Sequence, residues 1–143
     1  LRNQTWDVTI SHNSIVSADC FLRTGAYQIH GLTMQGNSSK EIFRTAIDFG
    51  SGEIADGHIS GNTFWMATAN ALWGIKASVT SLTRTRILNN NIFFDGGPTG
   101  NVGIELGGGT IVDSDISGNI IYHGSVFGSV DFSGLAPGNW ALT

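Results

Sequence analysis

The chain has 143 residues and a formal net charge of −4, and 41% of its residues are hydrophobic. The hydrophobic share and the charged fraction of 13% argue against disorder, so we expect one domain or a piece of one. The seven Lys and Arg form no basic run, one cysteine excludes an intrachain disulfide, and no apolar run is long enough to span a bilayer. We therefore expect no nucleic-acid partner and no membrane span. No Cys, His and Asp spacing indicates a metal site, so no metal or other cofactor is expected.

An asparagine recurs along the chain in one local pattern, read in order as ISHNSI, MQGNSS, ISGNTF, LNNNIF and ISGNII. The recurring residues are Asn13, Asn37, Asn62, Asn91 and Asn119, with spacings of 24, 25, 29 and 28 residues. An apolar residue lies three positions before each of them: Ile10, Met34, Ile59, Leu88 and Ile116. A period in this range indicates stacked structural repeats.

Between these asparagines, apolar and polar residues alternate in short runs broken by Gly, Asn and Ser, which predicts short strands. One apolar column lies 15 or 16 positions before Asn, at Phe21, Ile47, Ile75 and Ile104. Another contains Ile29, Ile54 and Ile111, with Leu82 displaced by one position. These separations predict three strands per repeat, with each repeat wrapping once and stacking in parallel on the next, about 4.8 Å away.

The recurring asparagine has a structural role in this scheme. Gly36, Gly61 and Gly118 immediately precede it, and Gly and Asn both tolerate left-handed backbone angles, which predicts a tight bend in each repeat. Stacked amides of this kind can hydrogen-bond along the column. The five asparagines are therefore expected to form a structural ladder.

The ISGN-type turns, the Asn ladder and the repeat length resemble the right-handed parallel β-helix of the pectate-lyase-like superfamily, over Val8 to Phe132. The resemblance implies an all-β fold, a right-handed single-stranded parallel β-helix (a solenoid) of five to six coils. We expect the β-helix to occupy residues 1–133, with residues 134–143 as a C-terminal tail or cap. The superfamily contains lyases, hydrolases, epimerases, adhesins and phage tailspikes, so the resemblance specifies the fold more than the function.

A column of charged residues is expected one position after the Ile47 column. Its members are Asp48, Lys76, Glu105 and Asp131, with Leu22 in the first coil. Stacking puts Glu105 and Asp131 roughly 5 Å apart, and Asp48 and Glu105 roughly 10 Å apart with Lys76 between them. Glycosidases use two carboxylates about 5–5.5 Å or about 6.5–9.5 Å apart, so these four residues are candidate catalytic residues. The alternative is a surface ladder in which Lys76 neutralises its acidic neighbours.

Aromatic residues occupy the outward position three residues after Asn in three successive coils: Trp65, Phe94 and Tyr122, preceded by Val16 and Lys40. An exposed stripe of this size is unusual without a role, and flat rings suit a sugar or a partner chain. Three interpretations are open, namely an oligomer interface, a carbohydrate-binding surface, and a stripe covered by the chain's own loops.

Three functions are compatible with these features. The first is a β-helix segment of a phage tailspike- or fibre-like protein, a virion or extracellular shaft that forms a homotrimer or larger assembly and binds host-surface polysaccharide. Low charge, Gly-, Ser-, Asn- and Thr-rich coils, the stripe, and a repeat that begins at about Val8 without a capping helix favour it. The second is a secreted polysaccharide lyase or glycoside hydrolase, and the third is a purely structural virion or surface protein.

The sequence lacks the signatures of the superfamily's enzymes. Asn-Thr-Asp, Asp-Asp, Gly-His-Gly and Arg-Ile-Lys of polygalacturonase-like enzymes are missing, as is Asp-Pro-His of alginate epimerases; Gly57-His58-Ile59 is the nearest fragment. Pectate-lyase-like enzymes pair a basic residue with calcium-binding acids, of which Lys76 between Asp48 and Glu105 is a loose analogue. Whether the chain is an enzyme stays open.

Overall fold

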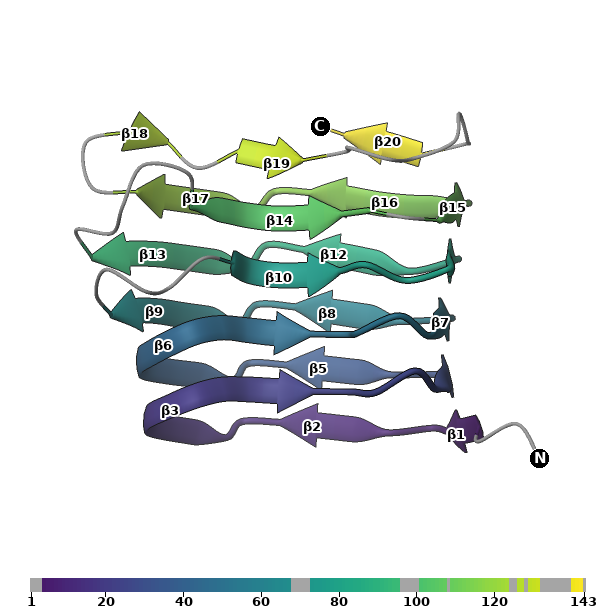
Figure 1. Ribbon diagram of the computed structural model, residues 1–143, viewed down its shortest axis with the longest axis horizontal. Helices are drawn as coiled ribbons and strands as arrows, with labels where there is room; N and C mark the ends of the chain where they lie inside the picture. The colour runs from purple at the N-terminus through teal and green to yellow at the C-terminus, as the bar shows by residue number, and fades with distance from the viewer. Residues whose placement is uncertain are drawn as a thin grey trace.

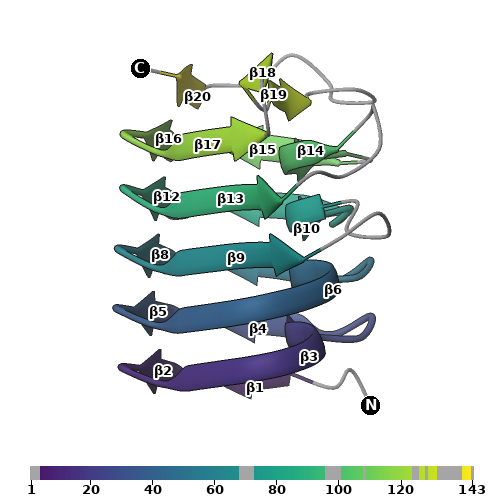
Figure 2. The same cartoon turned by 90° about the vertical axis from the view of Figure 1, so that its left-hand side faces the viewer.

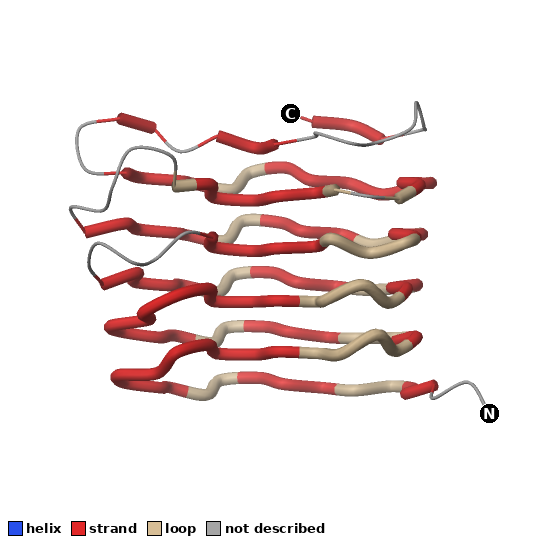
Figure 3. The backbone as a smooth tube through the Cα atoms, in the orientation of Figure 1, coloured by secondary structure: helices blue, strands red, loops and turns tan. Residues whose placement is uncertain are grey.

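The computed structural model describes residues 4–67, 73–95, 101–107, 109–123, 126–127, 129–131 and 140–142, with side chains described up to residue 122. The chain winds as a right-handed parallel β-helix, and its coils stack from the N-terminal end to the C-terminal end (Figures 1 and 2). The described residues form strands and connecting loops (Figure 3). They make about four turns, slightly fewer than the five to six coils expected, because five ladder positions enclose only four intervals.

Three sheets form the walls of the helix. Sheet 1 contains β1 (Gln4–Trp6), β4 (Gln28–His30), β7 (Glu53–Ala55), β11 (Ser81–Thr83) and β15 (Thr110–Val112). Sheet 2 contains β2 (Thr9–Ser11), β5 (Thr33–Gln35), β8 (His58–Ser60), β12 (Arg86–Leu88), β16 (Ser114–Ser117) and β20 (Trp140–Leu142). Sheet 3 contains β3 (Ser14–Arg23), β6 (Ser38–Asp48), β9 (Thr63–Ala67), β10 (Trp73–Ala77), β13 (Asn91–Asp95), β14 (Val102–Leu106), β17 (Ile120–His123), β18 (Val126–Phe127) and β19 (Ser129–Asp131).

Parallel pairing prevails through all three sheets, and the antiparallel pair β17–β18 is the exception among the described strands. At the C-terminal end, β20 continues sheet 2 by pairing with β16. Residues 132–139 and Thr143 lie outside the described residues, so the assignment of residues 134–143 to a tail or cap stays a prediction.

The Asn ladder is present, but its fourth member is Asn90 and the expected Asn91 is wrong. The backbone N–H of each ladder residue donates to the Oδ1 of the next, with N···O distances of 3.0, 3.0, 3.1 and 3.0 Å from Asn13 through Asn37, Asn62 and Asn90 to Asn119. The Nδ2 group of each donates to the same Oδ1, at 2.9–3.2 Å. From Asn37 onward, the Nδ2 group also donates to a main-chain carbonyl of the preceding coil.

Asn91 instead lies one position into sheet 3, where it pairs with Thr63 and Ile120. The bend before the ladder has a positive φ in every coil, at His12 (55°), Gly36 (63°), Gly61 (61°), Asn89 (53°) and Gly118 (62°). Asn89 therefore takes the place that Gly occupies in three of the coils, since Asn tolerates this conformation better than most residues. Three consecutive asparagines concealed which of them is the bend residue and which is the ladder residue.

The one-residue correction brings the apolar columns into constant register. Ile87, and not Leu88, pairs with Ile59 and Ile116, and Leu82 pairs in line with Ile54 and Ile111. In the first coil Leu22, and not Phe21, pairs with Ile47. Leu22, Ile47, Ile75 and Ile104 each precede their ladder Asn by 15 residues, so the column has no irregular member.

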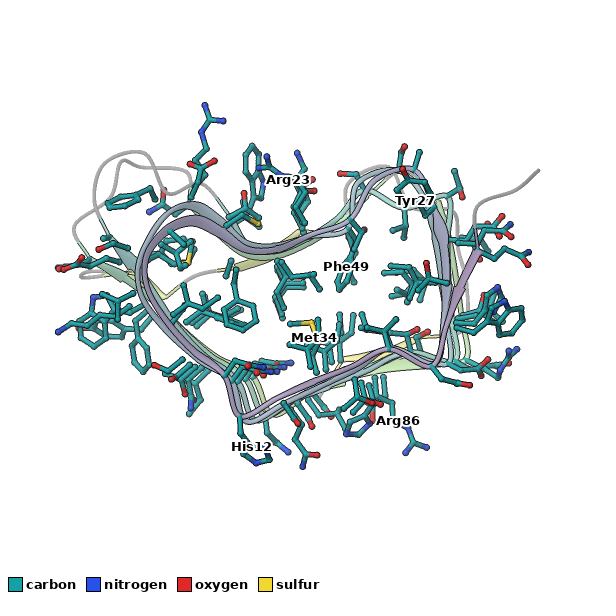
Figure 4. The ribbon with its side chains drawn as sticks, turned by 90° about the horizontal axis from the view of Figure 1, so that it is seen from below. His12, Arg23, Tyr27, Met34, Phe49 and Arg86 are labelled. Carbon is teal, nitrogen blue, oxygen red and sulfur yellow. The ribbon has the colours of Figure 1, made fainter. Side chains whose placement is uncertain are left out.

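These inward columns form one continuous core between the sheets. A view along the helix axis shows Met34 and Phe49 inside the coil, and His12, Arg23, Tyr27 and Arg86 on its outer side (Figure 4). Met34, Ile59, Ile87, Ile75 and Ile104 are fully buried. Removing this much apolar surface from water is the main favourable contribution to folding.

The coils differ in length at one corner. From sheet 3 through sheets 1 and 2 to the next ladder Asn, the columns keep the same separations in every coil. Across the corner within sheet 3, eight positions separate Ser39 from Ile47, eleven separate Phe64 from Ile75, and twelve separate Ile92 from Ile104. β3 and β6 run through this corner, whereas later coils divide it between two strands, such as β9 and β10 (Figure 2).

Asn90→Ala and Asn91→Ala form a matched pair that tests the ladder assignment. Asn90→Ala removes the acceptor of two donors of buried Asn62, so we expect the free energy of unfolding to fall by about 1–3 kcal/mol. Asn91→Ala leaves the ladder intact and is expected to cost less. Urea unfolding measures both, and a larger loss for Asn91→Ala would contradict the assignment.

Ser39 interrupts an apolar column and has a buried hydroxyl, 6% exposed as a residue, with no hydrogen-bond partner. Ser39→Ala removes this unpaired polar atom, so we expect the protein to become more stable by about 1 kcal/mol. Exposed Ser38→Ala is the control, and thermal unfolding compares the two. Equal or lower stability for Ser39→Ala would show that the hydroxyl is satisfied in solution.

Candidate functional site

Two outward surfaces on sheet 3 contain the residues singled out in the sequence. The first, here called the aromatic stripe, comprises Trp65 on β9, Phe93 on β13 and Tyr122 on β17, which pair in register. Phe94 was the residue expected in this position, and that expectation is wrong. Phe94 pairs with Met66 in the core and is only 3% exposed, because the shift from Asn91 to Asn90 also moves the stripe by one residue.

The rings of the aromatic stripe contact one another along the helix axis. Trp65 and Phe93 are stacked, with ring centroids 5.5 Å apart and planes 28° apart. Phe93 and Tyr122 have centroids 6.5 Å apart and planes tilted by 52°. Rings this close and nearly parallel turn their faces toward neighbouring coils, so Trp65 and Phe93 present mainly their edges to solvent.

Trp65 and Tyr122 are 45% and 49% exposed, so the chain's own residues leave both rings accessible. Val16 and Lys40 pair with each other in the first two coils and are both exposed. Ile120, two positions before Tyr122 on the same strand, is also exposed. The stripe is therefore part of a wider apolar surface with aliphatic as well as aromatic members.

The second surface, here called the charged ladder, contains Arg23, Asp48, Lys76 and Glu105, paired in register on β3, β6, β10 and β14. The expected residues Asp48, Lys76 and Glu105 are brought together on successive strands. Arg23 takes the place expected for Leu22, which pairs with Ile47 in the core column. The backbone of Asp131 pairs with that of Glu105, and the side chain of Asp131 lies outside the described residues.

Both described carboxylates of the charged ladder are held by groups other than Lys76. Asp48 Oδ1 accepts the backbone N–H of Gly50 at 3.0 Å, and Asp48 Oδ2 lies 3.4 Å from Arg23 Nε. Glu105 Oε2 accepts the indole N–H of Trp73, and Glu105 Oε1 accepts the hydroxyl of Ser78 at 3.2 Å. Two charged acceptors are thus fixed on a partly buried surface.

Lys76 is turned away from both carboxylates. Its Nζ lies over the ring of Trp73, 4.0 Å from the centroid, in a cation–π contact. Within the described part of the chain, it forms no ion pair with Asp48 or Glu105, although it lies between them in register. The predicted neutralisation of these acids by Lys76 therefore does not take the form of salt bridges.

The charged ladder can accept and donate hydrogen bonds at regular intervals. Asp48 and Glu105 are two strand intervals apart, roughly 10 Å at the backbone, which is close to the upper limit for an inverting pair of carboxylates. A general acid must present a free carboxyl oxygen to its substrate, whereas both oxygens of Glu105 already accept a bond. The geometry suits binding better than acid–base chemistry.

An ion pair at another corner perturbs a carboxyl group. Arg84 donates from Nε and Nη2 to Asp56 at 2.6 and 2.9 Å, and these hydrogen bonds lower the pKa of the Asp56 carboxyl. The same bonds raise the pKa of Arg84. Both side chains are exposed to solvent, so the pair resembles an ordinary surface salt bridge and is not a candidate site.

Arg23, Trp73, Ser78 and Phe93 are the members of the two surfaces that the sequence reasoning missed. A constant offset of 15 residues between the Ile47 column and the ladder Asn would have found Arg23 and Phe93, since it selects Leu22 and Asn90 together. No pattern in the sequence predicts that Trp73 and Ser78 bind Glu105, because neither belongs to a repeated column of like residues.

Comparisons with protein-family models, with curated proteins and with solved structures found no match. None of the described residues belongs to a helix long and apolar enough to cross a membrane. Among the same residues, no group of three or more His, Cys, Asp and Glu side chains is placed to hold a metal ion.

Phe93→Ala and Phe94→Ala test the placement of the stripe. Phe94→Ala empties a buried volume in the core, so we expect the free energy of unfolding to fall by about 3–5 kcal/mol. Phe93→Ala removes a partly exposed ring and is expected to cost about 1 kcal/mol or less. Chemical unfolding of both variants measures the difference, and the reverse order would return Phe94 to the stripe.

Proposed function

We propose that this chain is a rigid shaft segment of a tailspike- or fibre-like virion protein of the pectate-lyase-like superfamily. In this proposal the segment packs laterally against copies of itself, as a homotrimer or in a larger virion assembly, and meets host-surface polysaccharide outside the cell. The observation that carries the proposal is the aromatic stripe, an exposed and in-register surface on a fold made of stacked coils.

The geometry of the stripe favours a protein partner over a sugar at this surface. A sugar ring stacks on the face of an aromatic ring, but the faces of Trp65 and Phe93 are turned toward each other. The exposed edges, with Ile120 beside Tyr122, form an apolar ridge of the kind that is buried in subunit interfaces. Lateral packing of shafts would remove this ridge from water.

The stacking of the coils supports a shaft. Backbone hydrogen bonds connect each coil to the next in all three sheets, and the ladder adds buried amide bonds at one corner. Such a structure has no hinge between its described coils. A rigid rod is what a fibre needs in order to hold a binding surface at a fixed distance from its base.

A polysaccharide lyase or glycoside hydrolase is the weaker proposal. Its support is the register that aligns Asp48, Lys76 and Glu105 and adds the backbone of Asp131. Against it stand the bonds that already occupy both oxygens of Glu105. A purely structural role without sugar contact differs from the main proposal only in the absence of glycan binding.

Light scattering and sedimentation test lateral packing. We expect the wild-type protein to form trimers, and the double variant Trp65→Lys, Tyr122→Lys to be monomeric with little change in melting temperature, because both side chains are already exposed. Tyr27→Lys, at an equally exposed tyrosine on another corner, is the control and should leave the trimer intact. A monodisperse wild-type monomer would contradict this function.

A further inference from the structure

The charged ladder contains a cation without an acidic partner beside two acids that have partners of their own. Lys76 lies in register between Asp48 and Glu105, and of the three ion pairs among the described residues none involves it. Its Nζ lies over the Trp73 ring, and a ring face accepts no conventional hydrogen bond. The N–H groups of Lys76 can therefore donate to a bound molecule.

The neighbouring carboxylates have fixed positions and spare acceptor capacity. Each ionised carboxylate has about four acceptor sites. Glu105 uses two of them for Trp73 and Ser78, and Asp48 uses two for Gly50 and Arg23. Because these bonds hold the carboxylates in place, a ligand would not have to order them, which reduces the entropic cost of binding.

The surface alternates in charge along the helix axis. Arg23, Asp48, Lys76 and Glu105 follow one another at strand spacing, about 4.8 Å, and their described side chains carry two positive and two negative charges. A molecule with one charge sign would be repelled at every second position. A hydroxyl group is suited to both kinds of position, because it accepts from an ammonium and donates to a carboxylate.

The coil lengths point to the same side of the molecule. All variation in coil length falls between the aromatic stripe and the charged ladder, whereas the other separations are constant. In stacked-repeat proteins, insertions collect on one face, which is often the binding face. This observation is independent of the contacts of Lys76.

We propose that the charged ladder, with Trp73 as its aromatic member, binds an extended neutral glycan aligned with the helix axis. Vicinal hydroxyls of the glycan accept from Lys76 and donate to Glu105 and Asp48, and no bond is made or broken. The proposal rests on the function above in taking polysaccharide as the ligand class, but it assigns the glycan to the charged ladder and leaves the aromatic stripe for lateral packing.

Titration by NMR can test this site directly, with the indole N–H of Trp73 as the reporter because it donates to Glu105. The probes are neutral oligosaccharides prepared from dextran, β-glucan, mannan and galactan, and anionic oligogalacturonate. We expect at least one neutral probe to shift the Trp73 signal in a saturable manner, and oligogalacturonate to bind more weakly. Lys76→Met, which keeps the apolar stem and loses the ammonium, should weaken binding about tenfold or more.

Lys40→Met is the matched control, since exposed Lys40 lies on the other surface and should leave the affinity unchanged. Melting temperatures confirm that both variants are folded. The site is wrong if no neutral probe shifts the Trp73 signal, if oligogalacturonate binds more tightly, or if Lys76→Met binds as well as wild type. Light scattering on the same samples separates this result from lateral packing, because Lys76→Met should still form trimers.

Discussion

The buried amide of the ladder Asn is the interaction on which the rest of the structure depends. A corner of the coil must turn inside the molecule, where an unpaired N–H or C=O costs about 1–3 kcal/mol. Asn62 and Asn90 are fully buried and meet this demand by accepting two donors and donating to carbonyl groups of the preceding coil. Because each amide is tied to the next coil, one coil cannot slip against its neighbour by a single residue.

A fixed register explains why outward residues form continuous surfaces. The side chains of paired residues point the same way, so residues scattered along the sequence come into contact as columns. Trp65 meets Phe93, and Lys76 comes to lie between Asp48 and Glu105, although about 28 residues separate each pair of neighbours. The core and both surfaces thus follow from the same alignment of coils.

Much of the fold can be predicted from the spacing of like residues, since a parallel stack repeats its sequence pattern. The β-helix, three strands per coil and the Asn ladder were predicted in this way and are confirmed. The errors at Asn91 and Phe94 share one cause: three consecutive asparagines satisfy the pattern in more than one register, and only hydrogen bonding selects Asn90. The bonds from Trp73 and Ser78 to Glu105 depend on side-chain rotamers and could not be predicted.

The corner within sheet 3, where coil length varies, has a consequence for how such a chain can change. Seven of the positions from Ile47 to Ile54 recur unchanged from Ile75 to Leu82, so a residue added there would displace every column beyond it. A residue added between Phe64 and Ile75 displaces none, because the next coil resumes its register at Ile75. The scaffold therefore has a single site at which new sequence can be tried without unfolding the old, and it borders both exposed surfaces.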